Sequence, residues 1–241
     1  MSLCFLISHK YKRLDYVDIA WGGGFIVIST LDYLRNSTFL SLTILILVLL
    51  WGIRLMNHIT KRFILKGVDK RYTELSSKWK TKNFWLRAFF SIFMLQALLM
   101  FIISLPIAYV SYIKASNVNV FFIIGLGLYI FGYIFEAVAD LQLNRYLKEA
   151  KRAKVLKSGL WNYSRHPNYF GEILLWFGIG TLIQGNNYIT LVGYLGPIIL
   201  SYTIIAVSGI PPIEDKRSKD TEYVKYKQIT SMLVPWFKKA N

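Results

Sequence analysis

The sequence is poor in cysteine, histidine and acidic residues. Cys4 is the only cysteine, which excludes an intrachain disulfide and a cysteine metal site. The three histidines, His9, His58 and His166, are far apart in the sequence, and we expect no metal site. No signal peptide is expected either, because the short apolar run at residues 3–8 precedes the first positive charges instead of following them.

Long apolar runs dominate the chain. Hydrophobic residues make up 54% of it and the mean hydropathy is +0.40. Several nearly uninterrupted apolar runs reach about 18 residues, the length of a transmembrane helix. The sequence therefore predicts an all-α, polytopic helical membrane bundle that forms one integral membrane domain over residues 1–241. We expect about six spans, at residues 17–34, 39–55, 88–113, 118–141, 169–184 and 188–210.

The distribution of the basic residues predicts the orientation of these spans. With both termini cytosolic, the cations fall in the N-terminal segment, in cytosolic loops near 56–87 and 142–168, and in a cytosolic tail at 211–241. Only Arg35 and Lys114, of 29 Lys and Arg, lie on the other side, which is a strong positive-inside bias. The formal net charge of +16 thus reflects topology and contact with anionic membrane lipids, and no nucleic-acid partner is expected.

The densest set of polar side chains is the stretch G-L-W-N-Y-S-R-H-P-N-Y-F-G-E at residues 159–172. Pro167 suits the first turn of a helix, so we expect a helix to begin there. A helix start presents unpaired N–H groups to anions, above all phosphates, and Arg165 and His166 stand beside it. Glu172 lies one turn into the apolar run, where a carboxylate needs a partner. The alternative is a plain cytosolic cap, with Arg165 meeting lipid headgroups.

Two further polar groups accompany this stretch. One recurs every three or four residues within and beyond the fourth expected span, and its members are Tyr129, Tyr133, Glu136, Asp140 and Asn144. Such a stripe must face the interior of the bundle or a water-filled cavity, either as a site or as a structural network. The other group lies in the tail, where four charged residues, Glu214, Asp215, Lys216 and Arg217, follow the break at Pro211 and Pro212. Tyr223 and Tyr226 of this group lie on an expected short amphipathic helix that could cover the cytosolic mouth, with surface anchoring by these tyrosines and Trp236 as the alternative.

The glycines indicate helix packing rather than nucleotide binding. Residues 22–24 and the pair Gly125 and Gly127 lie inside expected spans, with no preceding strand, so they lack the context of a dinucleotide-binding fingerprint. We expect close contact between helices at these positions.

The sequence resembles the signature of the bacterial DUF1295 membrane proteins, relatives of the steroid 5-alpha-reductase and sterol reductase superfamily. Its most specific part is S-R-H-P-N-Y-F-G-E at residues 164–172. Further agreement lies in D-x-x-W-G at 18–22, W-G-I-R-L at 51–55, D-K-R-Y at 69–72, A-D-x-Q at 139–142 and T-S-x-x-x-P-W at 230–236. The family pattern has another apolar span before residue 18, where this chain has only the run 3–8. The core R-H-P-x-Y-x-G, residues 165–171, is shared with isoprenylcysteine and phospholipid methyltransferases, which use S-adenosylmethionine.

The resemblance implies a reductase in the bacterial inner membrane that adds a hydride from NADPH to an activated double bond of a lipophilic, steroid-like or isoprenoid, substrate. Its cofactor site would face the cytosol. Seven cations against the single Glu149 in residues 145–165 suit a polyphosphate cofactor. The expected cofactor-binding residues are Glu136, Asp140, Tyr163, Arg165, His166, Asn168, Tyr169, Glu172, Tyr223 and Tyr226. An S-adenosylmethionine-dependent methyltransferase and a non-catalytic membrane protein of the same fold remain as alternatives.

Two catalytic residues are expected from the same resemblance. Superfamily reductases polarise the substrate carbonyl with a Glu and Tyr pair from the early helices. Asp18 is the nearest acidic candidate, and Trp51 stands about where the tyrosine would be. Helix capping is the alternative role for Asp18.

Overall fold

The computed structural model describes residues 1–77, 79, 81–112, 118–185 and 188–238. Helices dominate these residues, and the only β-structure among them is an isolated bridge between Ser164 and Ser231. The predicted all-α fold is confirmed. The chain divides into two compact units, an N-terminal unit, Met1–Ser116, and a C-terminal unit, Asn117–Asn241.

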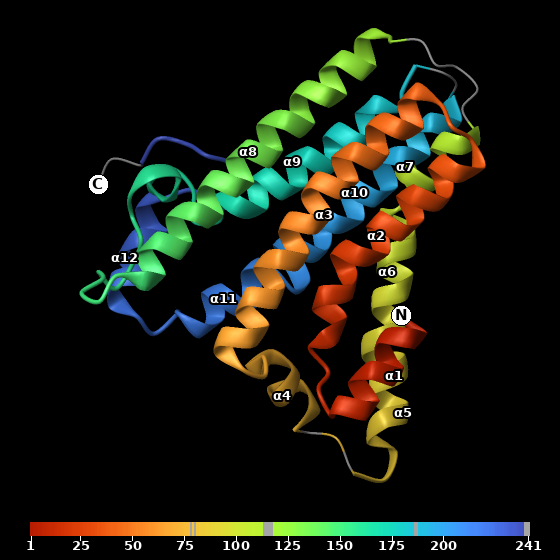
Figure 1. Ribbon diagram of the computed structural model, residues 1–241. Helices are drawn as coiled ribbons and strands as arrows, with labels where there is room; N and C mark the ends of the chain where they lie inside the picture. Colours follow the sequence, from red (N-terminus) through yellow and green to blue (C-terminus); the bar gives the residue numbers. More distant parts are fainter. Residues whose placement is uncertain (78, 80, 113–117, 186–187, 239–241) are drawn as a thin grey trace. The chain divides into compact units, whose positions relative to one another are not determined.

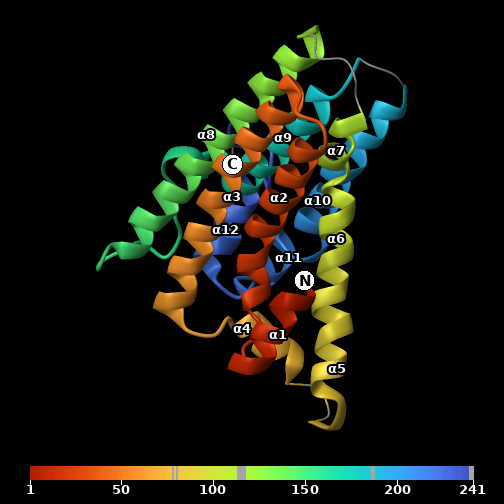
Figure 2. The ribbon, with the colours of Figure 1, turned by 45° about the vertical axis from the view of Figure 1, so that its right-hand side comes forward.

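The N-terminal unit is built around the helix pair α2 and α3, which run side by side (Figures 1 and 2). Its helices are α1 (Ser2–Tyr11), α2 (Tyr16–Arg35), α3 (Phe39–Lys66), α4 (Lys70–Ser76), η1 (Thr81–Asn83), α5 (Phe84–Ala88), the π-helical η2 (Phe89–Met94), α6 (Leu95–Ile103), α7 (Leu105–Ala108) and η3 (Val110–Tyr112). A Cβ at Gly22 would lie 2.6 Å from the carbonyl oxygen of Gly52 on α3. The predicted close helix packing is thus confirmed at Gly22.

The C-terminal unit is built around a second pair, α8 and α9 (Figure 1). Its helices are α8 (Val120–Lys148), η4 (Gly159–Asn162), α9 (Pro167–Leu182), η5 (Tyr188–Tyr194), α10 (Leu195–Tyr202), the π-helical η6 (Thr203–Val207), α11 (Ile210–Lys216) and α12 (Thr221–Ile229). Glycines let the α8 and α9 backbones touch: a Cβ at Gly125 would lie 2.7 Å from the carbonyl oxygen of Gly178. Gly127 was wrongly expected to share this role, because a Cβ there would meet nothing within 4 Å.

Within the described residues, five helical segments are long and apolar enough to cross a membrane, which identifies an integral membrane protein. They are Tyr16–Arg35, Phe39–Ile64, Phe84–Ile103, Val120–Lys148 and Leu191–Lys216. The remaining expected span corresponds to α9, which has 16 residues and falls short of that length. The fifth expected span, at 169–184, and the cytosolic termini stay predictions, and Lys114 lies outside the described residues.

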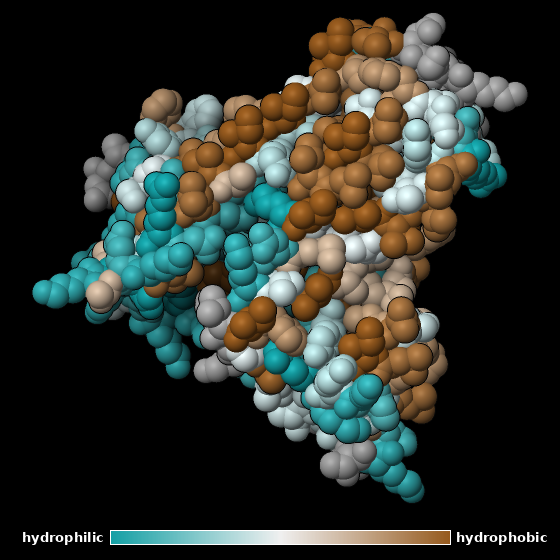
Figure 3. All heavy atoms as spheres, viewed as in Figure 1, coloured by the Kyte–Doolittle hydropathy of each residue, from teal (hydrophilic) through white to brown (hydrophobic). Residues whose placement is uncertain are grey.

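α8 changes character along its length. Asn119 caps its start by accepting a hydrogen bond from the N–H of Phe122 at 2.9 Å. Apolar side chains such as Ile123, Phe131 and Ile134 are exposed along the helix, as expected of a lipid-facing surface. Figure 3 shows a brown surface along much of α8 that gives way to teal toward the last turns of the helix. The polar end leads into the segment that builds the candidate site.

Candidate functional site

The candidate site lies where α9 begins. Pro167 occupies the first turn of α9, so the predicted helix start is confirmed. The residues just before it are held by the chain's tail: the N–H of Arg165 donates to the carbonyl of Ser231 at 2.8 Å, and the Ser164 hydroxyl donates to the carbonyl of Leu233 at 2.7 Å. Segments 62 or more residues apart in the sequence therefore form one wall.

A buried ion pair fixes this wall. The guanidinium of Arg165 donates to Glu214 Oε1 at 2.8 Å and to the carbonyl oxygens of Lys227 at 3.0 Å and Thr230 at 2.7 Å. Glu214 also contacts the Lys227 ammonium at 2.7 Å. Burying these charges is tolerable because each has an opposite partner. The guanidinium of Arg165 thus joins α11 to α12, and its expected contact with a phosphate stays a prediction.

His166 is neutral at physiological pH. Burial, which outweighs the nearby Glu214 carboxylate, lowers the pKa of His166 to about 4. Its contact with Glu214 Oε1 at 3.2 Å is therefore a hydrogen bond from a neutral ring and not an ion pair. The ring also stacks on Tyr169, with 5.8 Å between the ring centroids. A neutral imidazole held in this way can donate or accept a hydrogen bond without adding charge.

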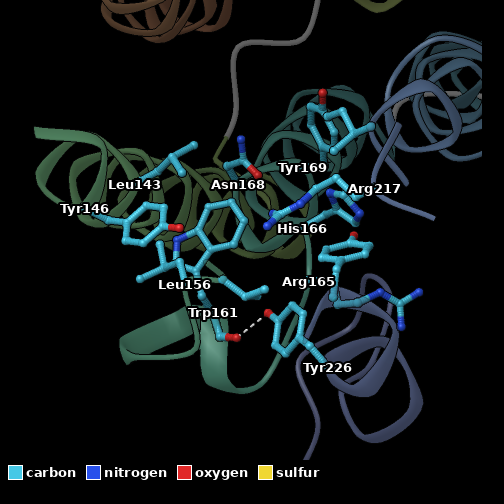
Figure 4. A pocket seen from close by; sticks show the side chains of 13 residues that line it. Leu143, Tyr146, Leu156, Trp161, Arg165, His166, Asn168, Tyr169, Arg217 and Tyr226 are labelled. Carbon is cyan, nitrogen blue, oxygen red and sulfur yellow. Dashed lines mark hydrogen bonds between the residues drawn. The ribbon is translucent and has the colours of Figure 1, made fainter. Parts of the chain in front are cut away.

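A cavity of about 150 Å³ opens beside this wall (Figure 4). Six of the expected cofactor residues line it: Arg165, His166, Asn168, Tyr169, Tyr223 and Tyr226. The remaining lining residues are Leu143, Tyr146, Val155, Leu156, Trp161, Ile213 and Arg217. No Asp or Glu belongs to the lining within the described part of the chain. The cavity therefore combines flat aromatic walls with cationic and neutral polar groups.

Asn168 connects the cavity to the polar stripe of α8. Its amide nitrogen donates to Asp140 Oδ1 at 3.3 Å, while its amide oxygen is buried and accepts no hydrogen bond from any described residue. A buried acceptor without a donor is costly, and a ligand that donates a hydrogen bond would relieve that cost. Among the stripe residues, Tyr129 and Glu136 are buried, Tyr133 and Asp140 are half-buried, and Asn144 is exposed, so the stripe is most exposed at the C-terminal end of α8.

The predicted short helix in the tail is confirmed as α12. Tyr223 and Tyr226 are buried with Val155, so the alternative that they anchor the protein to a surface is wrong. The Tyr226 hydroxyl donates to the carbonyl of Trp161 at 2.5 Å. Burial, followed by the Glu214 carboxylate, raises the pKa of Tyr223 to about 12, and burial likewise raises the pKa of Tyr226. Both phenols therefore keep their protons at neutral pH.

Four expected cofactor residues do not belong to the cavity lining that the structure describes, and one of them, Asp140, contacts the lining residue Asn168. Glu136 is buried on α8, Glu172 is half-buried on α9, and Tyr163 is partly exposed with its ring edge against Phe237. Their cofactor roles stay predictions. The cavity lining also includes Trp161 and Arg217, which were not predicted from the sequence as cofactor residues. Trp161 lies inside the stretch 159–172, and this position was the available signal.

The expected catalytic residues both lie in the N-terminal unit, each in its own setting. Asp18 accepts hydrogen bonds from the Tyr72 hydroxyl at 2.5 Å and from the Arg71 guanidinium at 2.8 Å, so helix capping is the wrong alternative for it. Trp51 is buried on α3, in edge-to-face contact with Phe25 at 5.6 Å. Trp51 thus packs in the core, and its catalytic role stays a prediction.

The missed partner of Asp18 is Tyr72, the last residue of the D-K-R-Y motif. Burial, followed by the Asp18 carboxylate, raises the pKa of Tyr72 well above its ordinary value. Gln96 also donates to the Tyr72 hydroxyl at 3.3 Å. Arg62 and Arg71 both bridge Asp18 and Asp69, which fixes the carboxylate in place. The N-terminal unit therefore holds a half-buried carboxylate and a buried phenol in direct contact.

Comparison with known proteins yields one match. Residues 4–230 match the family described as "Protein of unknown function (DUF1295)". No curated protein and no solved structure matches the chain.

Proposed function

The chain belongs to the DUF1295 family, and we propose that it is a membrane-embedded reductase that uses NADPH to saturate an activated double bond of a lipophilic substrate. The single observation that carries the proposal is the make-up of the cavity at the start of α9. Arg165 and Arg217 line it, and no carboxylate does so among the described residues. Glu214 pairs with Arg165, so Arg217 is the lining cation that would meet a phosphate. Such a lining suits an anionic, phosphate-bearing cofactor better than the cationic sulfonium of S-adenosylmethionine.

The residues also fit the flat end of a nicotinamide nucleotide. Aromatic side chains of Tyr146, Trp161 and Tyr169 form part of the cavity wall. The buried amide oxygen of Asn168 is an acceptor for the donor that a carboxamide provides. A volume of about 150 Å³ admits one ring system and not a whole dinucleotide. The phosphates would therefore extend beyond the ring pocket, from Arg217 in its lining toward the exposed cations Arg145, Lys148 and Arg152.

The roles of the chain's residues follow from these positions. The Arg217 guanidinium lies 4.4 Å from the ring centroid of Tyr223, donates to the carbonyl of Lys154 at 2.7 Å and pairs with Asp220 at 3.8 Å, so three contacts hold it at the cavity. It would bind a phosphate oxygen. Neutral His166 would orient the nicotinamide ring by a hydrogen bond, without electrostatic repulsion. When bound, NADPH supplies the hydride and becomes NADP⁺.

The reduction also requires a proton, and we assign its delivery to the pair of Asp18 and Tyr72. Tyr72 keeps its proton at neutral pH because burial and the Asp18 carboxylate raise its pKa. A phenol that retains its proton can donate a hydrogen bond to the oxygen on which negative charge develops. The single hydroxyl proton of Tyr72 is directed at Asp18, at 2.5 Å, so this donation requires the hydroxyl to turn from Asp18 toward the substrate oxygen. Trp51 would then shape the apolar surroundings.

Replacement of Arg217 by Gln tests the cofactor site, with Lys219→Gln as the matched control. Lys219 is exposed two residues further along and does not belong to the described cavity lining. Arg217→Gln should weaken equilibrium binding of NADPH about tenfold, because it removes a charge-assisted hydrogen bond. Lys219→Gln should bind like the parent. If folded Arg217→Gln protein, checked by its melting temperature, binds NADPH as tightly as the parent, the cavity is not the cofactor site.

A further inference from the structure

The last described part of the tail, residues 232–238, exposes large apolar side chains, although its backbone is bonded to the wall of the first cavity. Trp236 is 69% exposed and Phe237 is 77% exposed, and Met232 and Val234 are exposed as well. These side chains lie close together in the sequence, with no helix or strand among them. Exposed apolar residues gathered in this way mark a surface for interaction.

The backbone of this tail segment is fixed rather than loose. Three hydrogen bonds tie residues 231–236 to residues 163–165: from the N–H of Arg165 to the carbonyl of Ser231, from the Ser164 hydroxyl to the carbonyl of Leu233, and from the N–H of Trp236 to the carbonyl of Tyr163 at 3.0 Å. The ring of Phe237 also meets the ring of Tyr163 edge-on, at 6.2 Å. The exposed aromatic side chains are therefore displayed by an ordered backbone.

The charged residues in and just before this segment are all basic. From Tyr223 to the last residue the sequence holds four lysines and no Asp or Glu. Lys225, Lys227 and Lys238 are exposed in the described part. Tryptophan with lysine is the composition found at the boundary between membrane and water, where the ring enters the headgroup layer and the ammonium meets anionic lipid.

A second cavity, of about 320 Å³, lies beside the tail segment. Arg165, Lys227 and Thr230 line it together with Trp236 and Phe237. Glu214 neutralises one of the two cations, Arg165 and Lys227, so one positive charge remains in the cluster. A cavity lined by both cations and aromatic rings suits a phosphate joined to an apolar chain.

We propose that residues 232–238 form an interfacial anchor and that the second cavity receives the phosphate of an anionic phospholipid headgroup through Lys227. Trp236 and Phe237 enter the boundary between headgroups and acyl chains. Because the anchor is bonded to residues 163–165, lipid contact also steadies the wall from which Arg165 reaches the first cavity. This proposal stands apart from the reductase chemistry and does not require it.

The test measures the depth of residue 237 in lipid nanodiscs. A Cys4→Ser, Phe237→Cys protein carries a fluorophore at 237, and a Cys4→Ser, Ser218→Cys protein carries it at an exposed loop position as the control. Nanodiscs of phosphatidylglycerol are compared with nanodiscs of phosphatidylcholine. A lipid-borne quencher should dim the label at 237 about threefold more than the label at 218, and more in phosphatidylglycerol than in phosphatidylcholine.

Two further measurements complete the design. Lys227→Gln should reduce the phosphatidylglycerol effect to the level seen in phosphatidylcholine, whereas Lys219→Gln should not. Melting temperatures establish that both variants are folded. The difference in quenching between the two lipids, measured with Lys227 in place, tests the headgroup site even if a variant does not fold. Quenching of position 237 by aqueous iodide as strong as at position 218 would overturn the anchor. Equal lipid quenching in the two lipids would overturn the headgroup site.

Discussion

Glu214 joins three segments of the C-terminal unit. Its carboxylate accepts hydrogen bonds from Arg165 and His166, which precede α9, and contacts Lys227 of α12. Because the carboxylate is buried, its cations and the histidine ring satisfy it in place of water. This cluster holds the wall of the first cavity in place. It also keeps His166 buried, so the pKa of His166 differs between the folded and the unfolded chain.

Replacing His166 by Gln should remove part of the parent's sensitivity to mild acid. Burial lowers the pKa of folded His166 to about 4, whereas an unfolded histidine titrates near about 6.5. The unfolded chain thus binds more protons below that pH, and the free energy of unfolding falls as the pH drops. From pH 7 to pH 5 the loss is about 2 kcal/mol.

Melting temperatures of detergent-purified protein at pH 7 and pH 5 check this expectation. The fall between the two values should be smaller in His166→Gln than in the parent. An identical fall in both proteins would mean that His166 is already protonated in the folded state.

The sequence predicted some of these residues and not the contacts that hold them. Arg165, His166 and Asn168 could be selected because their side chains crowd a helix start. Glu214 could not, because the run E-D-K-R at 214–217 reads as a solvated charged segment. Its burial depends on α11 and α12 folding back onto residues 163–166, which is a long-range event. Tyr72 was missed in the same way, since 54 residues separate it from Asp18.

At the scale of elements, backbone contact between α8 and α9 sets the position of the site. Glycines on each helix lie against the backbone of the other. For example, a Cβ at Gly178 would lie 2.6 Å from the backbone nitrogen of Tyr129. Asp140 on α8 and Asn168 on α9 can meet at 3.3 Å because the helices approach so closely. The sequence predicted close packing from glycine in apolar helices. It could not tell Gly125 from Gly127, which lies on an open face.

Gly178→Ala should therefore destabilise the protein, while Gly127→Ala should not. An added methyl group at 178 forces the helices apart, at a cost of about 1 to 3 kcal/mol. At 127 the methyl group meets nothing within 4 Å, and alanine favours the helix. Thermal unfolding in one detergent compares the two variants. Equal melting temperatures would show that α8 and α9 do not touch at Gly178.

At the scale of the whole molecule, composition determined the class and resemblance supplied the chemistry. Apolar runs were sufficient to predict an integral helical membrane protein, because a lipid-spanning helix is recognisable from its length and polarity alone. Among the expected spans only α9, with 16 residues, is shorter than a membrane-spanning helix, because it begins at the polar residues of the candidate site. The choice between cofactors depends on the charge of the first cavity, which the sequence alone could not define.

The central claim is that this cavity is built for a phosphate-bearing nicotinamide cofactor, and ligand-dependent thermal stabilisation tests it most directly. Detergent-purified protein should be stabilised by NADPH, less by NADH and little by S-adenosylmethionine. At a ligand concentration of about 100 times the dissociation constant, the gain should be about 2.7 kcal/mol. The NADPH effect should shrink as salt rises, because phosphate contacts are screened. Stabilisation by S-adenosylmethionine without any response to NADPH would contradict the account and favour a methyltransferase.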